Sequence, residues 1–316
     1  MKKKIVILAI ILCSLFILGV VKDLAIKSIV TVVVSQVAGA PVHIDSLSLG
    51  ITNQSVKITG FKMYNPEGFS KNVLANLPLI KVSINIGALL KGKIHIKSAE
   101  VILDEIGLEK NKDGALNVDE LKIVKEAKVK QEKPVKQMPI LIDVLKLKMG
   151  KVVARDYSVQ KEPAVTVYNI NLDKAYKNIT SVQALVALLF AEPLKAAGIQ
   201  GAAVYGVAAL SGVAILPVAV VATFIGKDSV EEEFSANPDK VYNASIAVLK
   251  QKGKITKEDK DLRMISGVLN SAQIVVKIRK NANNKTGLVI SARKFFLPKQ
   301  EIAAGLLYEI SQYLGK

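Results

Sequence analysis

The sequence predicts an α+β protein with four parts: an N-terminal membrane anchor, a sheet of antiparallel strands, an apolar helical segment and a small C-terminal α+β domain. Three observations support this prediction. A lysine-led apolar run opens the chain, many segments alternate apolar and polar residues, and residues 196–226 carry no charge although the chain has 44 Lys and Arg. Membrane segments exclude charge, and a period of two is typical of strands with one buried face.

Residues 1–21 are expected to form the anchor. Three lysines precede 17 uncharged, mostly apolar residues, which is the pattern of a signal or anchor segment. The run ends at Val21 without a small-residue cleavage site, so an uncleaved signal-anchor with its lysines in the cytoplasm is favoured. Lipidation at Cys13 is less favoured than an uncleaved anchor, because Leu12 precedes the cysteine where a small residue is expected.

Composition excludes several classes of protein. The chain has one cysteine and two histidines, so it has neither an intrachain disulfide nor a thiolate metal site. The net charge of +17 suits anionic lipid headgroups. Nucleic acid is not expected as a partner, because the basic residues lack interleaved aromatic residues. With no nucleophile–base pair and no metal cluster, the sequence predicts no enzyme, no cofactor and no metal.

Residues 22–180 are expected to form the β domain. Apolar residues at helical spacing over 24–38 favour a short helix that ends at Gly39 and leaves the membrane, although the valines of this segment also fit a strand. After residue 41 the period changes to two, and turn residues such as Asn65-Pro66-Glu67-Gly68 separate the strands. The expected meander has one apolar and one polar face. No helices are predicted to cover the apolar face, so either the sheet curls on itself or something apolar occupies it.

The β domain is interrupted by a charged linker. Residues 122–139 hold six lysines and two glutamates, which predicts an exposed loop or a frayed helix. Alternation resumes over residues 145–157 and again over residues 165–172, where further strands are expected.

The order of several segments resembles the N-terminal part of the AsmA family. These segments are Gly39-Ala40-Pro41-Val42-His43-Ile44, Asn65-Pro66-Glu67-Gly68-Phe69, and residues 86–94 and 111–121. AsmA proteins are anchored in the bacterial inner membrane and face the periplasm. They are similar to the chorein and repeating β-groove proteins, whose curved sheets hold lipid chains in an apolar trough.

The resemblance implies a curved antiparallel β-sheet groove that binds or passes membrane phospholipid in outer-envelope biogenesis. It also implies localisation at the bacterial inner membrane, with the β domain facing the periplasm. The candidate groove residues are Ile58, Ile80, Val82, Ile84, Ile94 and Ile96, although ordinary core residues would show the same pattern. The alternative is a non-enzymatic envelope scaffold that shares the fold and binds protein partners.

Two local patterns suggest metal binding but have simpler interpretations. Residues 109–120 place oxygen ligands near calcium-loop spacing, with Gly114 sixth and Glu120 twelfth. Glu109 stands where Asp is usual and a strand pattern precedes it, so a turn between strands is favoured. His43 and His95 lie far apart without a matching carboxylate pattern and are interpreted as polar residues of strands.

Residues 181–226 are expected to form an apolar helical segment associated with the membrane. As a helix, the uncharged run over 196–226 would be about 46 Å long, which is long for one span and short for two. Its glycines and alanines favour close helix packing, and Pro217 should kink or end a helix. Three interpretations remain open: a tilted single span, a shallow or re-entrant hairpin, and a buried apolar hairpin that plugs the β-groove.

Residues 227–316 are expected to form the small α+β domain. Residues 229–234 predict a strand, Asn237-Pro238-Asp239 predicts the start of a helix, and residues 302–313 predict a final helix. Residues 234–242 resemble a family of small bacterial envelope lipoproteins of unknown function. Arg293-Lys294 before Phe295-Phe296 is interpreted as an ordinary strand end.

Overall fold

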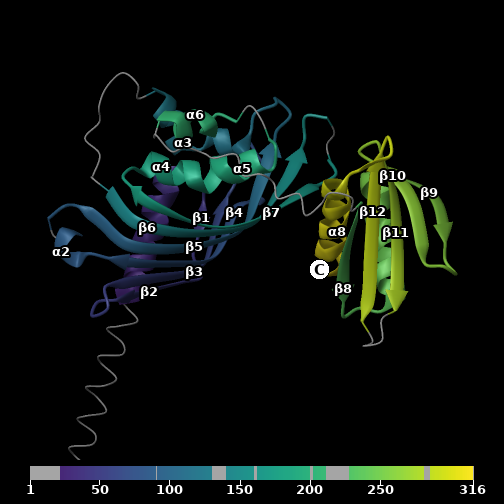
Figure 1. Cartoon of the computed structure of the whole chain (residues 1–316), viewed down its shortest axis with the longest axis horizontal. Coiled ribbons are helices and arrows are strands. Elements are labelled where there is room, and N and C mark those ends of the chain that lie inside the picture. The colour runs from purple at the N-terminus through teal and green to yellow at the C-terminus, as the bar shows by residue number, and fades with distance from the viewer. Residues whose placement is uncertain are drawn as a thin grey trace, which may run out of the picture.

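The computed structural model describes residues 22–89, 91–129, 140–159, 162–199, 202–210, 228–280 and 285–315. Within these ranges the chain forms two sheets, each with helices packed on it (Figure 1). The anchor predicted over residues 1–21 lies outside the described residues.

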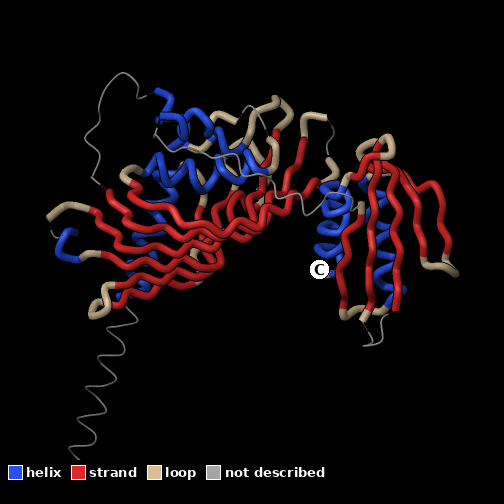
Figure 2. Tube along the Cα trace, in the orientation of Figure 1, coloured by secondary structure: helices blue, strands red, loops and turns tan. Residues whose placement is uncertain are grey.

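The first sheet has seven strands in the order β1-β3-β4-β5-β6-β7, with β2 paired to β3. It is strongly twisted and curved (Figure 2). The strands are β1 Val42–His43, β2 Ser46–Gly50, β3 Ser55–Tyr64, β4 Val73–Ile84, β5 Ile94–Lys110, β6 Ile140–Asp156 and β7 Thr166–Ile179.

One face of this sheet is apolar, as the period of two predicts. The register aligns Ile58 with Ile80, Ile80 with Val101, and Val101 with Leu147 across four strands. Lysines occupy the alternate positions; Lys57 pairs with Lys81 on the opposite face. We call the side with Val101 and Leu147 the covered face, because the helices described next lie on it.

The helix over residues 22–38 confirms the prediction made for 24–38. Its residues Ile26, Val30 and Val34 pack against the hydrophobic core of the β domain. Gly39, with φ of +70°, ends it against Lys122, where a Cβ would lie 2.7 Å from the lysine Cβ. The helix therefore covers part of the sheet instead of leading away from it.

The chain crosses the covered face once more between β5 and β6. The crossover contains η1 (Asn117–Glu120) and α3 (Lys122–Val129), and it buries Val118, Leu121 and Val124 in the core. Because this connection returns the chain to the end of the sheet where β5 began, β5 and β6 are parallel. The prediction of an antiparallel sheet was wrong at this position.

The segment predicted to associate with the membrane begins instead with short helices on the covered face. They are α4 (Val182–Val186), the π-helical turn η3 (Ala187–Ala191), α5 (Glu192–Ala196) and α6 (Val204–Leu210). Leu188, Leu194 and Val207 are almost fully buried in the same core as the sheet residues. Figures 1 and 2 show these helices gathered with α3 on one side of the curved sheet. Residues 211–227, including Pro217, lie outside the described ranges.

The predicted fold class was therefore wrong in two respects. The main sheet is mixed, not antiparallel, and its apolar face is covered by helices, a role that the sequence analysis considered only for the apolar segment and only as one of three open interpretations. In the described part of the chain, no helix combines the length and the apolar character needed to cross a bilayer.

The second sheet has the order β13-β12-β11-β10-β9, with β8 also paired to β12, and all of its pairings are antiparallel. Its strands are β8 Ser229–Phe234, β9 Lys254–Asp259, β10 Met264–Leu269, β11 Ala272–Lys280, β12 Thr286–Lys294 and β13 Leu297–Pro298. Helix α7 (Pro238–Lys252) starts where predicted, with the Asn237 side chain accepting from the Asp239 N–H at 2.8 Å.

Helix α8 (Gln300–Leu314) confirms the predicted final helix and joins the two sheets. Its residues Ile302, Leu306 and Ile310 are buried against the second sheet. On another side, Ala304 packs with Val153, Val165 and Val167 of the β domain. Gly305 permits this approach, because a Cβ there would lie 1.8 Å from the Val165 carbonyl oxygen.

Substitution of Gly305 by Ala should destabilise this contact. The new methyl group must displace α8 or the chain at Val165, which should cost about 1–3 kcal/mol. Alanine otherwise gains ~1 kcal/mol in a helix, so the net free energy of unfolding should fall by up to about 2 kcal/mol. Urea denaturation measures the change. Gly315→Ala is the matched control, because its Cβ would meet Ser311 O at an ordinary 3.5 Å. Equal effects of the two variants would contradict the close contact.

Candidate functional site

The six predicted groove residues lie side by side on the covered face. Ile58 belongs to β3, the three residues Ile80, Val82 and Ile84 follow on β4, and Ile94 and Ile96 begin β5. Ile58 pairs with Ile80, and Ile84 pairs with Ile96. All six are half-buried. We call this set the apolar strip.

Packing divides the apolar strip into two parts. Ile58, Ile80, Val82 and Ile96 pack against the core of the β domain, in which the helix over 22–38 and helices α4 to α6 take part. Ile84 and Ile94 lie at the end of β4 and the start of β5, beside α2 (Ile86–Leu89). The exposed lysines Lys91 and Lys93 follow α2 at this end of the sheet. The apolar strip therefore runs from a packed core to a basic rim.

A polar cluster around the buried Glu192 fixes α5 onto β7. The register aligns Lys174 with Leu147 and Tyr176 with Leu145, so both side chains reach the covered face. There the Lys174 Nζ lies 3.2 Å from a Glu192 carboxylate oxygen, and the Tyr176 hydroxyl donates to the other oxygen. Glu192 is 2% exposed. Burial, and then the Glu192 carboxylate, raise the pKa of the Tyr176 hydroxyl.

Helix α6 is fixed to the crossover between β5 and β6. The Asp119 carboxylate accepts from the Val204 N–H at 3.2 Å, and the Tyr205 hydroxyl donates to the Ile199 carbonyl. Burial, and then the charge of Asp119, raise the pKa of Tyr205 to about 12. The helices over the sheet are thus held by specific polar contacts as well as by apolar packing.

A second buried network joins two of the segments on which the predicted resemblance to AsmA proteins rests. Asn117 is fully buried; its amide donates to Asn65 Oδ1 and to the Gly107 carbonyl, both at 2.7 Å. The Glu109 carboxylate, 4% exposed, accepts from the Ser70 N–H at 2.8 Å and from Asn65 Nδ2 at 3.0 Å. These contacts fix the loop over 65–70 onto β5, which gives both asparagines a structural role.

The calcium-like pattern forms no metal site among the described residues. Glu109 points into the buried network just described, while Asn111 Oδ1 accepts from the N–H groups of Asp113 and Ala115 in a tight turn. Across the described ranges, no group of three or more His, Cys, Asp or Glu side chains is placed to hold a metal ion.

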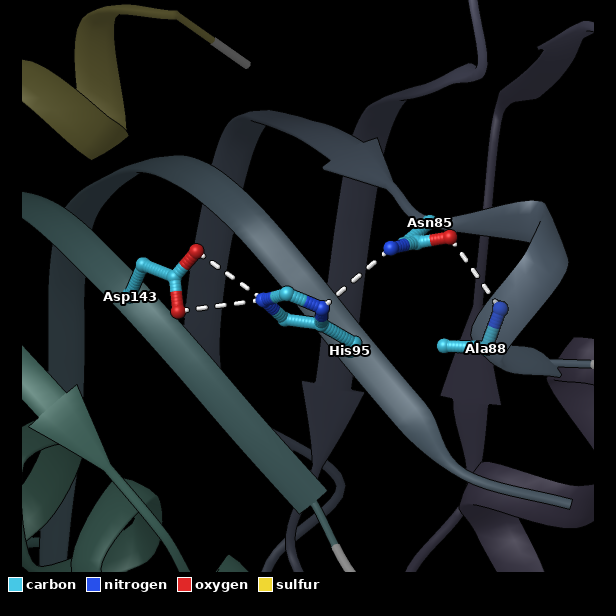
Figure 3. Close-up of polar contacts among 4 residues, drawn as sticks. All are labelled: Asn85, Ala88, His95 and Asp143. Carbon is cyan, nitrogen blue, oxygen red and sulfur yellow. Dashed lines mark hydrogen bonds and ion pairs between the residues drawn. The ribbon is translucent and has the colours of Figure 1, made fainter. Parts of the chain in front are cut away.

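The two histidines each meet a carboxylate that the sequence pattern did not assign to them. His43 Nε2 lies 3.1 Å from Asp45. His95 Nε2 lies 2.9 and 3.1 Å from the two oxygens of Asp143, and Asn85 Nδ2 lies 3.4 Å from His95 Nδ1 (Figure 3). Because Asn85 Oδ1 accepts from the Ala88 N–H at 3.1 Å, its amide nitrogen faces the ring. The network therefore assigns the imidazole proton to Nε2.

The contacts of His95 connect three parts of the chain at the end of the apolar strip that Ile84 and Ile94 form. Asn85 and His95 immediately follow Ile84 and Ile94, whose side chains lie on the opposite face. Asp143 comes from β6, the parallel neighbour of β5. Sequence analysis missed this contact, because the parallel pairing that places Asp143 near His95 was not predicted.

A cavity of about 830 Å³ opens at the opposite end of β5. Leu108, Leu116 and Tyr168 supply apolar lining, and the charged residues include Lys110 and Arg155. It shares the covered face with the apolar strip but lies at the far end of the strand. None of the six candidate groove residues lines this cavity, whereas Gly114 and Glu120 of the calcium-like pattern do.

Comparison with known proteins assigns no family. No protein-family model matches the chain, and no curated protein matches it significantly in sequence. The resemblance to AsmA proteins, and the resemblance of the C-terminal part to small envelope lipoproteins, therefore stay predictions.

The raised pKa of Tyr205 predicts a loss of stability in alkali. A tyrosine in the unfolded chain titrates near pH 10, whereas Tyr205 in the folded protein titrates near 12. Between pH 10 and pH 12 the folded state therefore binds more protons than the unfolded chain. The stability that this difference provides is fully present below pH 10 and is lost as the pH rises toward 12. Tyr205→Phe should reduce this slope in urea denaturation curves. Tyr313→Phe, at an exposed tyrosine of α8, is the control, and equal slopes in the two variants would contradict the assignment.

Proposed function

We propose that the β domain binds phospholipid by burying part of an acyl chain against the apolar strip. The observation that carries this proposal is the half-burial of six large apolar side chains that adjoin one another on three strands. Each methylene moved from water onto such a surface contributes about 0.8 kcal/mol. A chain segment of about ten methylenes would therefore supply roughly 8 kcal/mol, from which the entropic cost of association is subtracted.

The charges near the apolar strip favour a phospholipid over an uncharged apolar ligand. Lys91 and Lys93 are exposed at the end where Ile84 and Ile94 lie. In this proposal the acyl chain lies along β4 and β5, and the headgroup phosphate meets these two lysines. Both lysines are exposed, so salt screens their attraction to the phosphate in part.

The helices on the covered face limit the area of the sheet that lipid can contact. Along β6 and β7 the face is filled by α4, η3 and α5, and Lys174 and Glu192 are paired beneath them. We therefore propose a short binding site for one lipid at the end of the sheet, not a continuous trough along all strands. The proposed setting is the bacterial inner membrane with the β domain facing the periplasm, and the proposed activity is non-enzymatic.

A photo-crosslinking residue in place of Ile84 tests this proposal in cells. We expect it to capture phospholipid, identified by mass spectrometry, because Ile84 lies at the accessible end of the apolar strip. The matched control replaces Ile102, a half-buried isoleucine of β5 that pairs with Leu79 on the opposite face. It should capture little or no lipid.

Two results would overturn the proposal. Equal lipid capture at both positions would show that the opposite faces do not differ in lipid binding. Capture of one stable protein partner at position 84, without lipid, would favour the envelope scaffold.

A further inference from the structure

The two most exposed large apolar side chains in the described ranges, Phe295 and Phe296, lie at one hairpin tip of the C-terminal domain, beside the exposed Leu297. Phe295 is 85% exposed, Phe296 is 94% exposed and Leu297 is 64% exposed. Phe295 and Phe296 form the turn between β12 and β13, and Leu297 begins β13. Burial of one such ring is worth about 1.5–3 kcal/mol, so their exposure to water needs an explanation that the fold of this domain does not supply.

The hairpin holds both aromatic rings outward. Phe295 and Phe296 have φ of +49° and +65°, a conformation that bulky side chains adopt rarely and at a cost of about 1 kcal/mol or more each. The flanks are fixed: Arg293 pairs with Pro298 in the ladder, and the Lys299 N–H donates to the Ala292 carbonyl at 2.9 Å. The backbone conformation of this turn therefore places two adjacent rings at the tip.

Basic residues surround the tip. Arg293 and Lys294 precede the rings and Lys299 follows them by three residues. The guanidinium of Arg293 pairs with Asp228, and Lys299 Nζ lies 3.5 Å from Glu301. An apolar aromatic tip with a basic rim matches a bilayer surface, in which rings occupy the headgroup region and cations meet anionic phosphates.

The size of the tip argues against a protein partner. Three side chains offer at most on the order of 500 Å² of surface, whereas a specific protein interface buries roughly 800 Å² on each partner. Insertion into a lipid surface has no such requirement, because it needs only that the rings leave water.

We propose that the tip formed by residues 293–299 is a membrane-docking element that inserts Phe295 and Phe296 into the interface of a bilayer containing anionic phospholipid. This contact is separate from acyl-chain binding on the apolar strip. It would position the C-terminal domain, and through α8 the β domain, against a lipid surface.

A single tryptophan tests the insertion, because the chain contains no Trp. Phe296→Trp places the only indole at the tip of the full chain, where 94% exposure permits the substitution. On mixing with phosphatidylglycerol-containing vesicles we expect a blue shift of its emission and quenching by brominated lipid. Leu262→Trp is the matched control, since this residue is 69% exposed in the turn before β10, at the opposite end of the antiparallel strands. Its emission should not change.

The basic rim provides a second, independent measurement. In the Phe296→Trp background, Lys294→Gln with Lys299→Gln should raise the vesicle concentration that gives half of the shift by about thirtyfold, since each cation near an anionic surface contributes roughly fivefold. Absence of shift and quenching at position 296, or an equal response at positions 296 and 262, would overturn the proposal. So would a blue shift that appears only with an added cellular protein fraction and not with vesicles.

Discussion

The structure depends on one constraint: the apolar face of a seven-stranded sheet must be kept from water. Val101, Leu147 and their neighbours form a continuous apolar surface across four strands, and leaving it exposed would cost tens of kcal/mol. The helix over 22–38, the crossover after β5 and helices α4 to α6 all pack on this surface. Lys174 and Tyr176 fix the position of α5 through its buried Glu192. A misplaced helix would leave the buried charge of Glu192 unpaired.

The sequence allowed those features to be predicted that depend on local spacing. Alternation placed Ile80, Val82 and Ile84 on one face correctly, because the side chains of a strand alternate regardless of its neighbours. The start of α7 was predictable from Asn237 and Pro238, since capping is a local interaction. The helix over 22–38 was also predictable, although its contact with the sheet was not.

Contacts between distant segments could not be predicted in this way. Apolar segments that face lipid and apolar segments that pack on a β-sheet have similar compositions, so residues 182–210 fit both environments. Glu192 favours packing on the sheet, but only once its partner Lys174 is known. Of the three arrangements considered for the apolar segment, its described part resembles the apolar plug of the β-groove. The parallel pairing of β5 with β6, and with it the contact between His95 and Asp143, depends on the path of a crossover and not on local pattern. The outward rings of Phe295 and Phe296 depend on positive φ values that their residue types disfavour.

Hydrogen–deuterium exchange over residues 182–210 tests the central claim most directly, namely that this apolar segment covers the sheet. The account predicts slow amide exchange in α4, η3 and α5 in the absence of lipid, at rates similar to those of β6, and no further protection when vesicles are added. Fast exchange of this segment in solution, with protection that appears only in the presence of vesicles, would contradict it.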